Sequence, residues 1–391
     1  MKYDVIIAGG GPAGATAAME CARAGLSVII IEKEHLPRCK PCGGGVTAAA
    51  ANLLWCPIPE KIVEARCSSF HSFYGAKSIK IDSEKEFMYV VAREKFDYWL
   101  VRAAVHVGAV LREGEEITSF DIEPGGVTVR TGTAAYTGKL LIGADGVNSI
   151  IAKTIRGPFR RNELAFCFCT ECVDKENSDY NQGMIEIHYG PLPMSYSWVF
   201  PKRECLSVGT GGWCADVAGL KAALHNFLEK KGFEKQNVRG HALPLGGIRR
   251  TTVDDRVILA GDAAGFADPI TGEGIRYAVA SGRLAAKTAA SLLLAGLDLK
   301  IKNLLIYEER CYAEFGADLK AAMSIARLFQ RLPDFLFGMY FNSQEPFQKS
   351  LEIIHGRLSY QKYYRWFLHH IPFMLFRKVQ PSGLKPTNRA D

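Results

Sequence analysis

The first thirty residues alternate short apolar runs with a segment rich in alanine. Residues 3–8 (YDVIIA) and 26–31 (LSVIII) contain the β-branched residues typical of buried strands, whereas residues 13–24 are rich in alanine, which favours a helix. Glu32 follows the second apolar run directly. The pattern therefore predicts a strand, a helix and a second strand that ends at a carboxylate.

The turn between the first predicted strand and the helix is rich in glycine. Gly9, Gly11 and Gly14 have the spacing G-x-G-x-x-G. Gly9 permits a tight turn, Gly11 lets the backbone approach a pyrophosphate, and Gly14 lets the helix pack closely on the strand. Glu32 can accept both hydroxyls of an adenosine ribose and would repel a 2′-phosphate, so the unit predicts a dinucleotide other than NADP. Ala13, which precedes Gly14, and Lys33, which follows Glu32, are further candidates for contacts with the cofactor.

Two later apolar runs also lead into glycine-rich turns. Residues 140–142 run into the segment GADGVNS, which contains Asp145, and residues 256–260 run into GDAAG, which contains Asp262. A carboxylate at the end of a strand can bind sugar-like hydroxyls. The turn at Gly272 and Gly274 precedes a helix-like stretch and can offer backbone N–H groups to an anionic ring or a pyrophosphate.

These three glycine-rich segments resemble the FAD fingerprints of the flavoenzyme group that contains p-hydroxybenzoate hydroxylase. The resemblance implies FAD as the cofactor, with Asp262 on the ribityl chain and Asp145 on the dinucleotide side of the fold. It also places the segment from Gly272 and Gly274 to Ile275 near the isoalloxazine ring.

Arg93 resembles the arginine that precedes the second FAD-domain helix in that group, which makes it a further candidate for FAD binding. One position differs from the group. Its aspartate-glycine motif usually ends in an arginine, whereas the nearest basic residue here is Lys153. This difference weakens the interpretation as a hydroxylase.

Two further motifs resemble the geranylgeranyl reductase family. They are residues 37–45 (PRCKPCGGG) and 196–201 (YSWVFP), and the resemblance extends from residue 1 to about residue 315. The family reduces trisubstituted carbon–carbon double bonds of polyprenyl chains. The resemblance implies that the loop of Cys42, Gly43 and Gly44 lies against the flavin. A gating or redox role of Cys42 stays open.

Tyr196, Trp198 and Phe200 alternate along a predicted strand and therefore point to one face. Such a face can form an aromatic wall for an apolar substrate and can stabilise positive charge at a tertiary carbon. We therefore predict that all three bind the substrate, and that Tyr196 and Trp198 act in catalysis together with Cys42. The alternative is an ordinary core face of a sheet.

Cysteine spacing allows a metal site to be considered. Cys39 and Cys42 form a C-x-x-C pair, and Cys167, Cys169 and Cys172 follow much later. Residues 166–173 read as a strand, which places Cys167 and Cys169 on one face and Cys172 on the other. Buried thiols are therefore favoured, and no metal site is predicted.

The order of these segments predicts an α/β fold with a discontinuous, Rossmann-type FAD/NAD(P)-binding domain formed by residues 1–65, 93–160 and 245–300. Residues 66–92 and 161–244 contain alternating apolar and polar positions, which predict an inserted substrate-binding domain with an antiparallel sheet. Residues 301–391 form a helical C-terminal region. Within these parts, helices are expected over residues 215–231, 304–329 and parts of 334–376, and disorder from Pro381.

Composition excludes several classes of protein. Of the 391 residues, 48% are hydrophobic and 23% are charged, which is ordinary for a folded chain and excludes a disordered or collagen-like one. No apolar run is long enough for a transmembrane helix. The first strand begins near Tyr3, which leaves no room for a signal peptide, so we expect a cytoplasmic protein with reduced cysteines.

The net charge of +7 is concentrated near the C-terminus, where residues 351–391 carry seven basic and two acidic side chains with aromatic residues between them. This mixture suits the anionic inner face of a membrane, and the alternative is a helical cap with a solvated basic face. The remainder of the chain shows no basic stripe, so nucleic acid is not an expected partner.

Together these features predict an FAD-dependent oxidoreductase that reduces double bonds of a polyprenyl lipid by hydride transfer. The alternatives are a flavin monooxygenase of the same fold, such as an aromatic hydroxylase, and a flavin-binding partner without turnover. No second G-x-G-x-x-G is present, so a separate NAD(P)H domain is not expected. NAD(P)H, a ferredoxin or a deazaflavin remain alternative electron donors.

Overall fold

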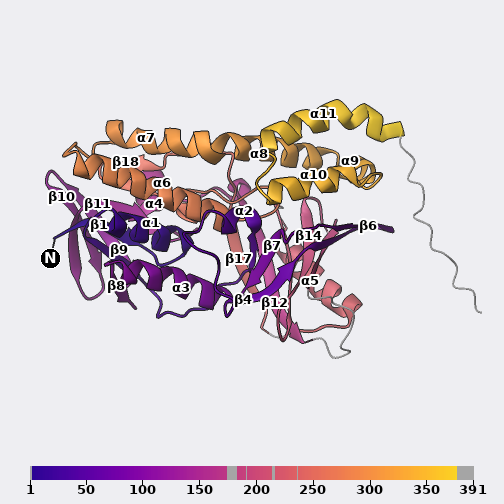
Figure 1. Cartoon of the computed structure of the whole chain (residues 1–391), viewed down its shortest axis with the longest axis horizontal. Helices are drawn as coiled ribbons and strands as arrows, with labels where there is room; N and C mark the ends of the chain where they lie inside the picture. Colours follow the sequence, from indigo (N-terminus) through magenta and orange to yellow (C-terminus); the bar gives the residue numbers. More distant parts are fainter. Residues whose placement is uncertain (1, 174–182, 191, 214–215, 236, 377–391) are drawn as a thin grey trace, which may run out of the picture.

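A computed structural model describes residues 2–173, 183–190, 192–213, 216–235 and 237–376 of the chain. Figure 1 shows an elongated molecule with one large sheet near the N-terminus and another at the opposite end. Helices from the C-terminal part run along one long edge and cover both. The tail from Pro381, for which disorder was expected, lies outside the described residues.

The first sheet has the order β18-β19-β11-β1-β2-β8, and β9 and β10 extend it beside β11. Its strands are β1 (Lys2–Ala8), β2 (Val28–Glu32), β8 (Val110–Glu113), β9 (Ile117–Glu123), β10 (Gly126–Thr131), β11 (Ala135–Gly143), β18 (Val253–Asp254) and β19 (Val257–Leu259). The pairs β8–β2, β2–β1, β1–β11 and β11–β19 are parallel. Parallel strands end at the same edge, which brings Gly9, Glu32, Gly143 and Gly261 together. The predicted Rossmann-type α/β fold is confirmed.

Helices cover this sheet: α1 (Pro12–Arg23), α3 (Arg93–His106), α4 (Ile150–Arg156) and α6 (Ile275–Leu294). A Cβ on Gly14 of α1 would lie 2.0 Å from the carbonyl oxygen of Gly9, and a Cβ on Gly282 of α6 would lie 2.4 Å from that of Ala13. Both positions therefore need glycine, because α1 packs directly on the preceding turn and on α6. The role predicted for Gly14 agrees with this geometry.

The second large sheet has the order β16-β12-β15-β14-β13-β5-β6, and β17 also pairs with β12. Its strands are β5 (Ser69–Tyr74), β6 (Lys77–Asp82), β12 (Leu164–Val173), β13 (Met184–Tyr189), β14 (Ser195–Pro201), β15 (Leu206–Gly212), β16 (Glu234–Lys235) and β17 (Arg239–Pro244). Its pairs are antiparallel except for β5 with β13. Helix α5 (Val217–Lys231) matches the helix expected over 215–231, of which residue 215 is outside the described residues.

A small sheet links the two large ones. It consists of β3 (Gly45–Thr47), β7 (Met88–Val91) and β4 (Val63–Cys67), and the short helix α2 (Ala48–Ala51) follows β3. Thr47 caps α2 by accepting a hydrogen bond from the Ala50 N–H. Since β3 and β7 come from segments that the sequence assigns to different domains, the domain boundaries remain a prediction.

The described part of the C-terminal region, residues 301–376, is helical, as expected. The run predicted over 304–329 consists of α7 (Ile301–Cys311), a π-helical turn at Tyr312–Gly316 and α8 (Ala317–Arg331). Three more helices follow: α9 (Pro333–Tyr340), α10 (Glu345–Ile354) and α11 (Tyr360–Phe376). Stacking of Phe329 on Phe367, with ring centroids 5.8 Å apart, holds α11 on α8. Within the described part of the chain, no helix combines the length and the apolar character needed to cross a membrane.

Candidate active site

A cavity of about 350 Å³ lies where the two large sheets and the C-terminal helices meet. Its volume is within the ~300–1,000 Å³ typical of small-molecule sites. Twelve of the residues predicted as site residues line it: Gly11, Ala13, Cys42, Gly43, Arg93, Tyr196, Trp198, Phe200, Asp262, Gly272, Gly274 and Ile275. The structure therefore brings together segments that are more than 200 residues apart in the chain.

The other predicted residues do not line the cavity: Gly9, Gly14, Glu32, Lys33, Gly44 and Asp145. The first two shape the turn before α1. Gly44 has a φ of +80°, and a Cβ there would lie 2.3 Å from the Val91 carbonyl oxygen, so it shapes the cysteine loop. Lys33 is exposed. Their roles in cofactor binding remain predictions.

Glu32 lies at the end of β2, as predicted, and is almost fully buried. Its Oε2 accepts a hydrogen bond of 2.7 Å from the Gly10 N–H, and Arg38 Nε lies 3.6 Å from its Oε1. Arg38 also lies beside Gly11, because its guanidinium is 3.7 Å from the position of a Cβ on that glycine. The sequence analysis missed Arg38, which places a positive charge where a pyrophosphate is expected.

Asp145 follows β11 and lies beside the first glycine turn, since its Cα is 3.1 Å from the position of a Cβ on Gly9. Its Oδ2 accepts a hydrogen bond of 2.9 Å from the Ile150 N–H at the start of α4. Burial raises the pKa of this carboxyl group. Asp145 thus holds the start of α4 beside the glycine turn that follows β1.

Arg93 begins α3 and lies in the wall of the cavity, 7% exposed. Its Nε and Nη2 each donate a hydrogen bond of 2.9 Å to the carboxylate of Asp97, to which Arg38 also donates. Burial works against the charge of Arg93, but Asp97 and the thiol of Cys42 raise its pKa above the usual value. This buried pair fixes a cation next to the cysteine loop. Asp97 is a second residue that the sequence analysis missed.

Asp262 follows β19 and also faces the cavity. Lys40 Nζ lies 3.7 Å from its Oδ2 and His241 Nε2 lies 3.9 Å from the same atom. Burial opposes ionisation, but His241 and Lys40 outweigh it and lower the pKa of Asp262 to about 2. Asp262 is therefore an anion at neutral pH, which suits an acceptor for sugar-like hydroxyls.

The aromatic residues of β14 form one wall of the cavity, as predicted. The ring centroids of Tyr196 and Trp198 are 6.1 Å apart, and those of Trp198 and Phe200 are 6.3 Å apart. Trp198 packs across Gly209 of β15, where a Cβ would lie 2.1 Å from the indole ring. The Tyr196 hydroxyl donates a hydrogen bond to the carbonyl oxygen of Thr271, which joins this wall to the turn before α6.

The cavity continues from the aromatic wall toward the C-terminal helices. The residues that line this extension are mostly apolar: Ile325, Ala326, Phe329, Phe337, Ile353 and Ile354. Tyr340, Ser350 and Tyr363 also line it, and their hydroxyls bond to one another. The site thus has a polar end at the first sheet and a mostly apolar end lined by α8, α9 and α10.

Polar atoms in the cavity wall agree with a bound cofactor. Trp198 Nε1 and His241 Nε2 are buried without a hydrogen-bond partner among the described residues, although both side chains line the cavity. Trp198 Nε1 is 3.1 Å from the position of a Cβ on Gly43, so glycine leaves the cysteine loop open beside it. The indole N–H of Trp198 can only donate, buried donors normally find acceptors, and the acceptor-rich FAD fits the residues present.

Thiols in the cavity wall carry no sign of a metal centre. Cys42 and Cys167 line the cavity, and Cys42 Sγ accepts a hydrogen bond of 3.3 Å from the Gly44 N–H. Cys167 and Cys169 lie on one face of β12, as predicted. Burial raises the pKa of Cys169 to about 12 and also raises that of Cys167. In the ranges that the structure describes, no three His, Cys, Asp or Glu side chains form a group suited to a metal ion.

Two carboxyl groups that the sequence analysis did not assign also line the cavity, Asp268 and Glu273. They belong to the segment between β19 and α6. Glu273 Oε1 accepts a hydrogen bond of 2.6 Å from the hydroxyl of Thr47. Burial and the nearby Asp268 raise the pKa of Glu273 to about 7, against the opposing effects of Thr47 and Arg276.

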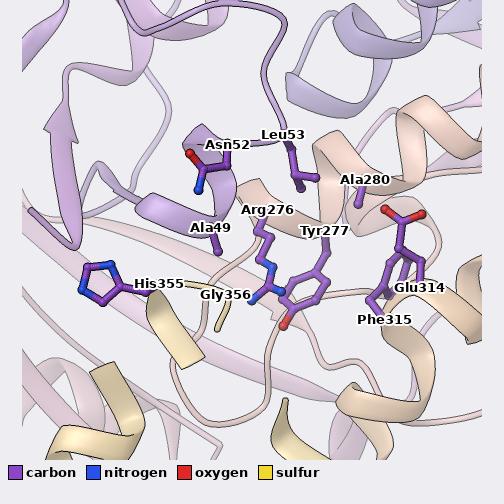
Figure 2. Close-up of a pocket in the computed structure, with 10 residues that line it drawn as sticks. All are labelled: Ala49, Asn52, Leu53, Arg276, Tyr277, Ala280, Glu314, Phe315, His355 and Gly356. Carbon is purple, nitrogen blue, oxygen red and sulfur yellow. The ribbon is translucent and has the colours of Figure 1, made fainter. Parts of the chain in front are cut away.

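A second, smaller hollow of about 210 Å³ lies beside the start of α6 (Figure 2). Arg276 lines both this hollow and the main cavity. Figure 2 shows its guanidinium between Tyr277 and Gly356, with Glu314 and His355 on opposite sides of the hollow. The small hollow therefore adjoins the cavity at the turn that carries Glu273.

Comparisons with known proteins agree with this geometry. A family model described as an FAD binding domain matches residues 2–189. Geranylgeranyl diphosphate reductase of Rhodobacter capsulatus is 30% identical over 385 residues, which cover 93% of this chain and 92% of the relative. Digeranylgeranylglycerophospholipid reductase 2 of Methanothermobacter thermautotrophicus is 30% identical over 356 residues, which cover 85% of this chain and 89% of the relative.

The fold is also that of a solved structure, a geranylgeranyl bacteriochlorophyll reductase-like protein from Thermoplasma acidophilum. The TM-score is 0.80 at 24% identity, and 96% of this chain and 98% of the other are covered. The cavity, the FAD-domain match and the two relatives lead to one conclusion: the chain belongs to the geranylgeranyl reductase family of FAD-dependent oxidoreductases.

Proposed function

We propose that this enzyme reduces carbon–carbon double bonds in the polyprenyl chain of a geranylgeranyl-type lipid. The observation that carries the proposal is one cavity in which the aromatic wall of Tyr196, Trp198 and Phe200 is continuous with both the cofactor end and the apolar end. The names of the Rhodobacter and Methanothermobacter relatives support a substrate of this class. A prenyl chain has only apolar surface, and burial in the apolar end is its main source of binding energy.

Reduced FAD supplies a hydride when it is bound. The residues of the chain then have three tasks. Arg38, Lys40 and Asp262 hold the polar parts of the cofactor through charge and hydrogen bonds. The aromatic faces of Tyr196 and Trp198 stabilise positive charge that develops on the more substituted carbon of the double bond. The apolar end excludes water from the reacting carbon atoms.

Electrons must reach the cofactor from an external carrier, and NAD(P)H, a ferredoxin or a deazaflavin are the donors to be compared. An anaerobic experiment tests the proposed reaction without a choice among them. The purified holoenzyme is reduced with dithionite and mixed with a geranylgeranyl lipid. We expect reoxidation of the flavin together with a mass gain of two hydrogens per reduced bond. Reduced flavin that ignores the lipid but reacts rapidly with oxygen in the presence of an aromatic substrate would instead establish the monooxygenase alternative.

We further propose that the apolar end of the cavity opens toward a membrane surface, to which the protein binds peripherally. Leu332, Phe335 and Leu368 are 44–51% exposed near the α8–α9 junction and on α11. Exposed basic side chains lie on the same helices: Arg327, Arg331, Lys362 and Arg365. Figure 1 shows α9 and α11 at the same end of the molecule. Since α9 also carries Phe337 of the cavity wall, a lipid tail has a short route from the bilayer.

Replacing Leu332 and Phe335 together by serine tests this surface. We expect binding to vesicles that contain anionic lipid to weaken ~10–30-fold, because each half-exposed side chain contributes about 1 kcal/mol on burial. Sedimentation with vesicles measures the binding. Leu297→Ser is the matched control, because Leu297 is equally exposed (53%) but follows α6. Equal binding by the double variant and the control would contradict a membrane surface here.

A further inference from the structure

Three carboxyl groups line the cavity in the described part of the chain, and they have different surroundings: Asp262, Asp268 and Glu273. Asp262 is held as an anion by Lys40 and His241. Asp268 is 2% exposed, and its Oδ1 accepts hydrogen bonds from the N–H groups of Ile270 and Thr271. Its Oδ2 is 3.4 Å from the Tyr277 hydroxyl. Asp268 therefore stabilises the turn and has no oxygen free for a substrate.

Glu273 differs because only one of its oxygens is engaged. Oε1 accepts the hydrogen bond from Thr47, whereas the described residues offer no hydrogen-bond partner to Oε2. The Thr47 hydroxyl already accepts from the Ala50 N–H, so its own hydrogen is the one directed at Glu273. A proton on the Glu273 carboxyl group is then carried by Oε2. The structure holds this group in the wall of the cavity, between Gly272 and Gly274.

Reduction of an isolated double bond adds one hydride and one proton. We propose that Glu273 is the catalytic residue that donates this proton to the substrate. The π electrons of the double bond form the new C–H bond with the proton of Oε2, and the electron pair of the broken O–H bond stays on the carboxylate. The other carbon receives the hydride, so each turnover consumes one two-electron reductant and one proton taken up from solvent. This role rests on the function proposed above and adds to it the source of the proton.

Other acidic groups in the cavity are less suited to this role. Tyr196 uses its hydrogen for the Thr271 carbonyl oxygen, and burial raises its pKa above the usual value. The thiol of Cys42 lies beside Arg93 and serves as a hydrogen-bond acceptor for Gly44. Asp262 is ionised. Glu273 is thus the cavity carboxyl group that is both protonated near neutral pH and free at one oxygen.

The surroundings of Glu273 also fit the state that remains after transfer. Four titratable groups act on it electrostatically: Asp268, Arg276, Tyr277 and Tyr360. Arg276 is the cation of this set and favours the carboxylate, whereas burial and Asp268 favour the neutral acid. Arg276 lines both the cavity and the smaller hollow of Figure 2, so a cation stands beside the carboxylate that remains after transfer.

Glu273→Gln tests the proposal, because glutamine keeps the size of the side chain but cannot donate an acidic proton. We expect lipid-dependent reoxidation of the reduced holoenzyme to slow at least ~100-fold, the lower end of the range for general acid catalysis, with the flavin content unchanged. Glu84→Gln is the control, because Glu84 is exposed and lines neither the cavity nor the smaller hollow. A wild-type protein that does not reduce the lipid would contradict the proposed function. An active wild type with a Glu273→Gln rate within about threefold of it would overturn the role of Glu273 alone.

A second readout does not depend on turnover. The raised pKa predicts that the Glu273 acid is present below about pH 7 and is lost above it. Infrared difference spectra of the holoenzyme should therefore show a carboxylic acid band that titrates near pH 7 and is missing in Glu273→Gln. Thr47→Val removes the hydrogen bond that favours the carboxylate, so the titration should move to higher pH, whereas Thr47→Ser should keep it. No such band, or no shift in Thr47→Val, would contradict the assignment.

Discussion

Asp262→Ala is expected to yield a folded protein that has lost its FAD. The side chain is a permanent anion beside Lys40 and His241 at the cofactor end of the cavity. A hydrogen bond to a charged group contributes about 1.5–3 kcal/mol, so the loss of this acceptor should weaken FAD binding at least ~10-fold per bond. Removal of the carboxylate also leaves Lys40 without its anionic partner. The ratio of flavin to protein absorbance after gel filtration measures the result.

Two comparisons make the Asp262 test specific. Asp262→Asn keeps the shape but loses the charge, and an intermediate flavin content is expected. Asp121→Ala changes an exposed aspartate on β9, far from the cavity lining, and should leave the flavin content unchanged. Stoichiometric FAD in Asp262→Ala would show that the carboxylate does not hold the cofactor. Unfolding, measured by circular dichroism, would instead indicate a structural role.

Local patterns were sufficient to predict four of the eight strands of the first sheet and the glycine turns beside them. Strands β1, β2, β11 and β19 each contain a short apolar run, with glycine or a carboxylate at the end of the strand or within two residues after it. Such a pattern is readable because a parallel strand is buried on both faces and its C-terminal end must leave space for a ligand. The close approach of Gly14 to the carbonyl oxygen of Gly9 shows the same constraint at one position.

Contacts between distant segments could not be predicted in this way. Thr47 and Glu273 are 226 residues apart, and Arg38 and Asp97 are 59 residues apart. Neither pair has a local sequence signal, because the partners meet only after the small sheet has packed against the turn before α6 and after α3 has packed near the cysteine loop. One feature of the sequence indicated Arg38 and Lys40, because both are basic residues within the motif PRCKPCGGG.

The aromatic strand β14 could be predicted from the sequence only in part. Alternation along β14 correctly predicted that Tyr196, Trp198 and Phe200 share a face, because side chains of a strand alternate regardless of the fold. It did not reveal that Gly209 on β15 makes room for the indole ring. Nor did it reveal that α8, α9 and α10 extend the cavity beyond the wall, since helix packing depends on side chains far from this strand.

Trp198→Ala should impair reduction of the lipid while FAD stays bound. An aromatic face near a developing cation contributes about 2 kcal/mol in a desolvated site, so the rate of lipid-dependent flavin reoxidation should fall at least ~30-fold. The side chain borders an existing cavity, and its removal enlarges that space without removing a core partner of the first sheet. Trp55→Ala is the matched control, because Trp55 stacks on Trp99 with a centroid distance of 4.6 Å and does not line the cavity.

Gly209→Ala tests the aromatic wall by displacing the ring of Trp198 instead of removing it. A Cβ at this position would overlap the indole, so Trp198 must move toward the cavity or the strand pair must separate. We expect a slower reaction with bound FAD, as for Trp198→Ala, because the position of the aromatic face matters as much as its presence. If flavin content falls in step with activity in both variants, β14 serves the fold alone. Loss of activity at constant flavin content establishes the aromatic wall as part of the substrate site.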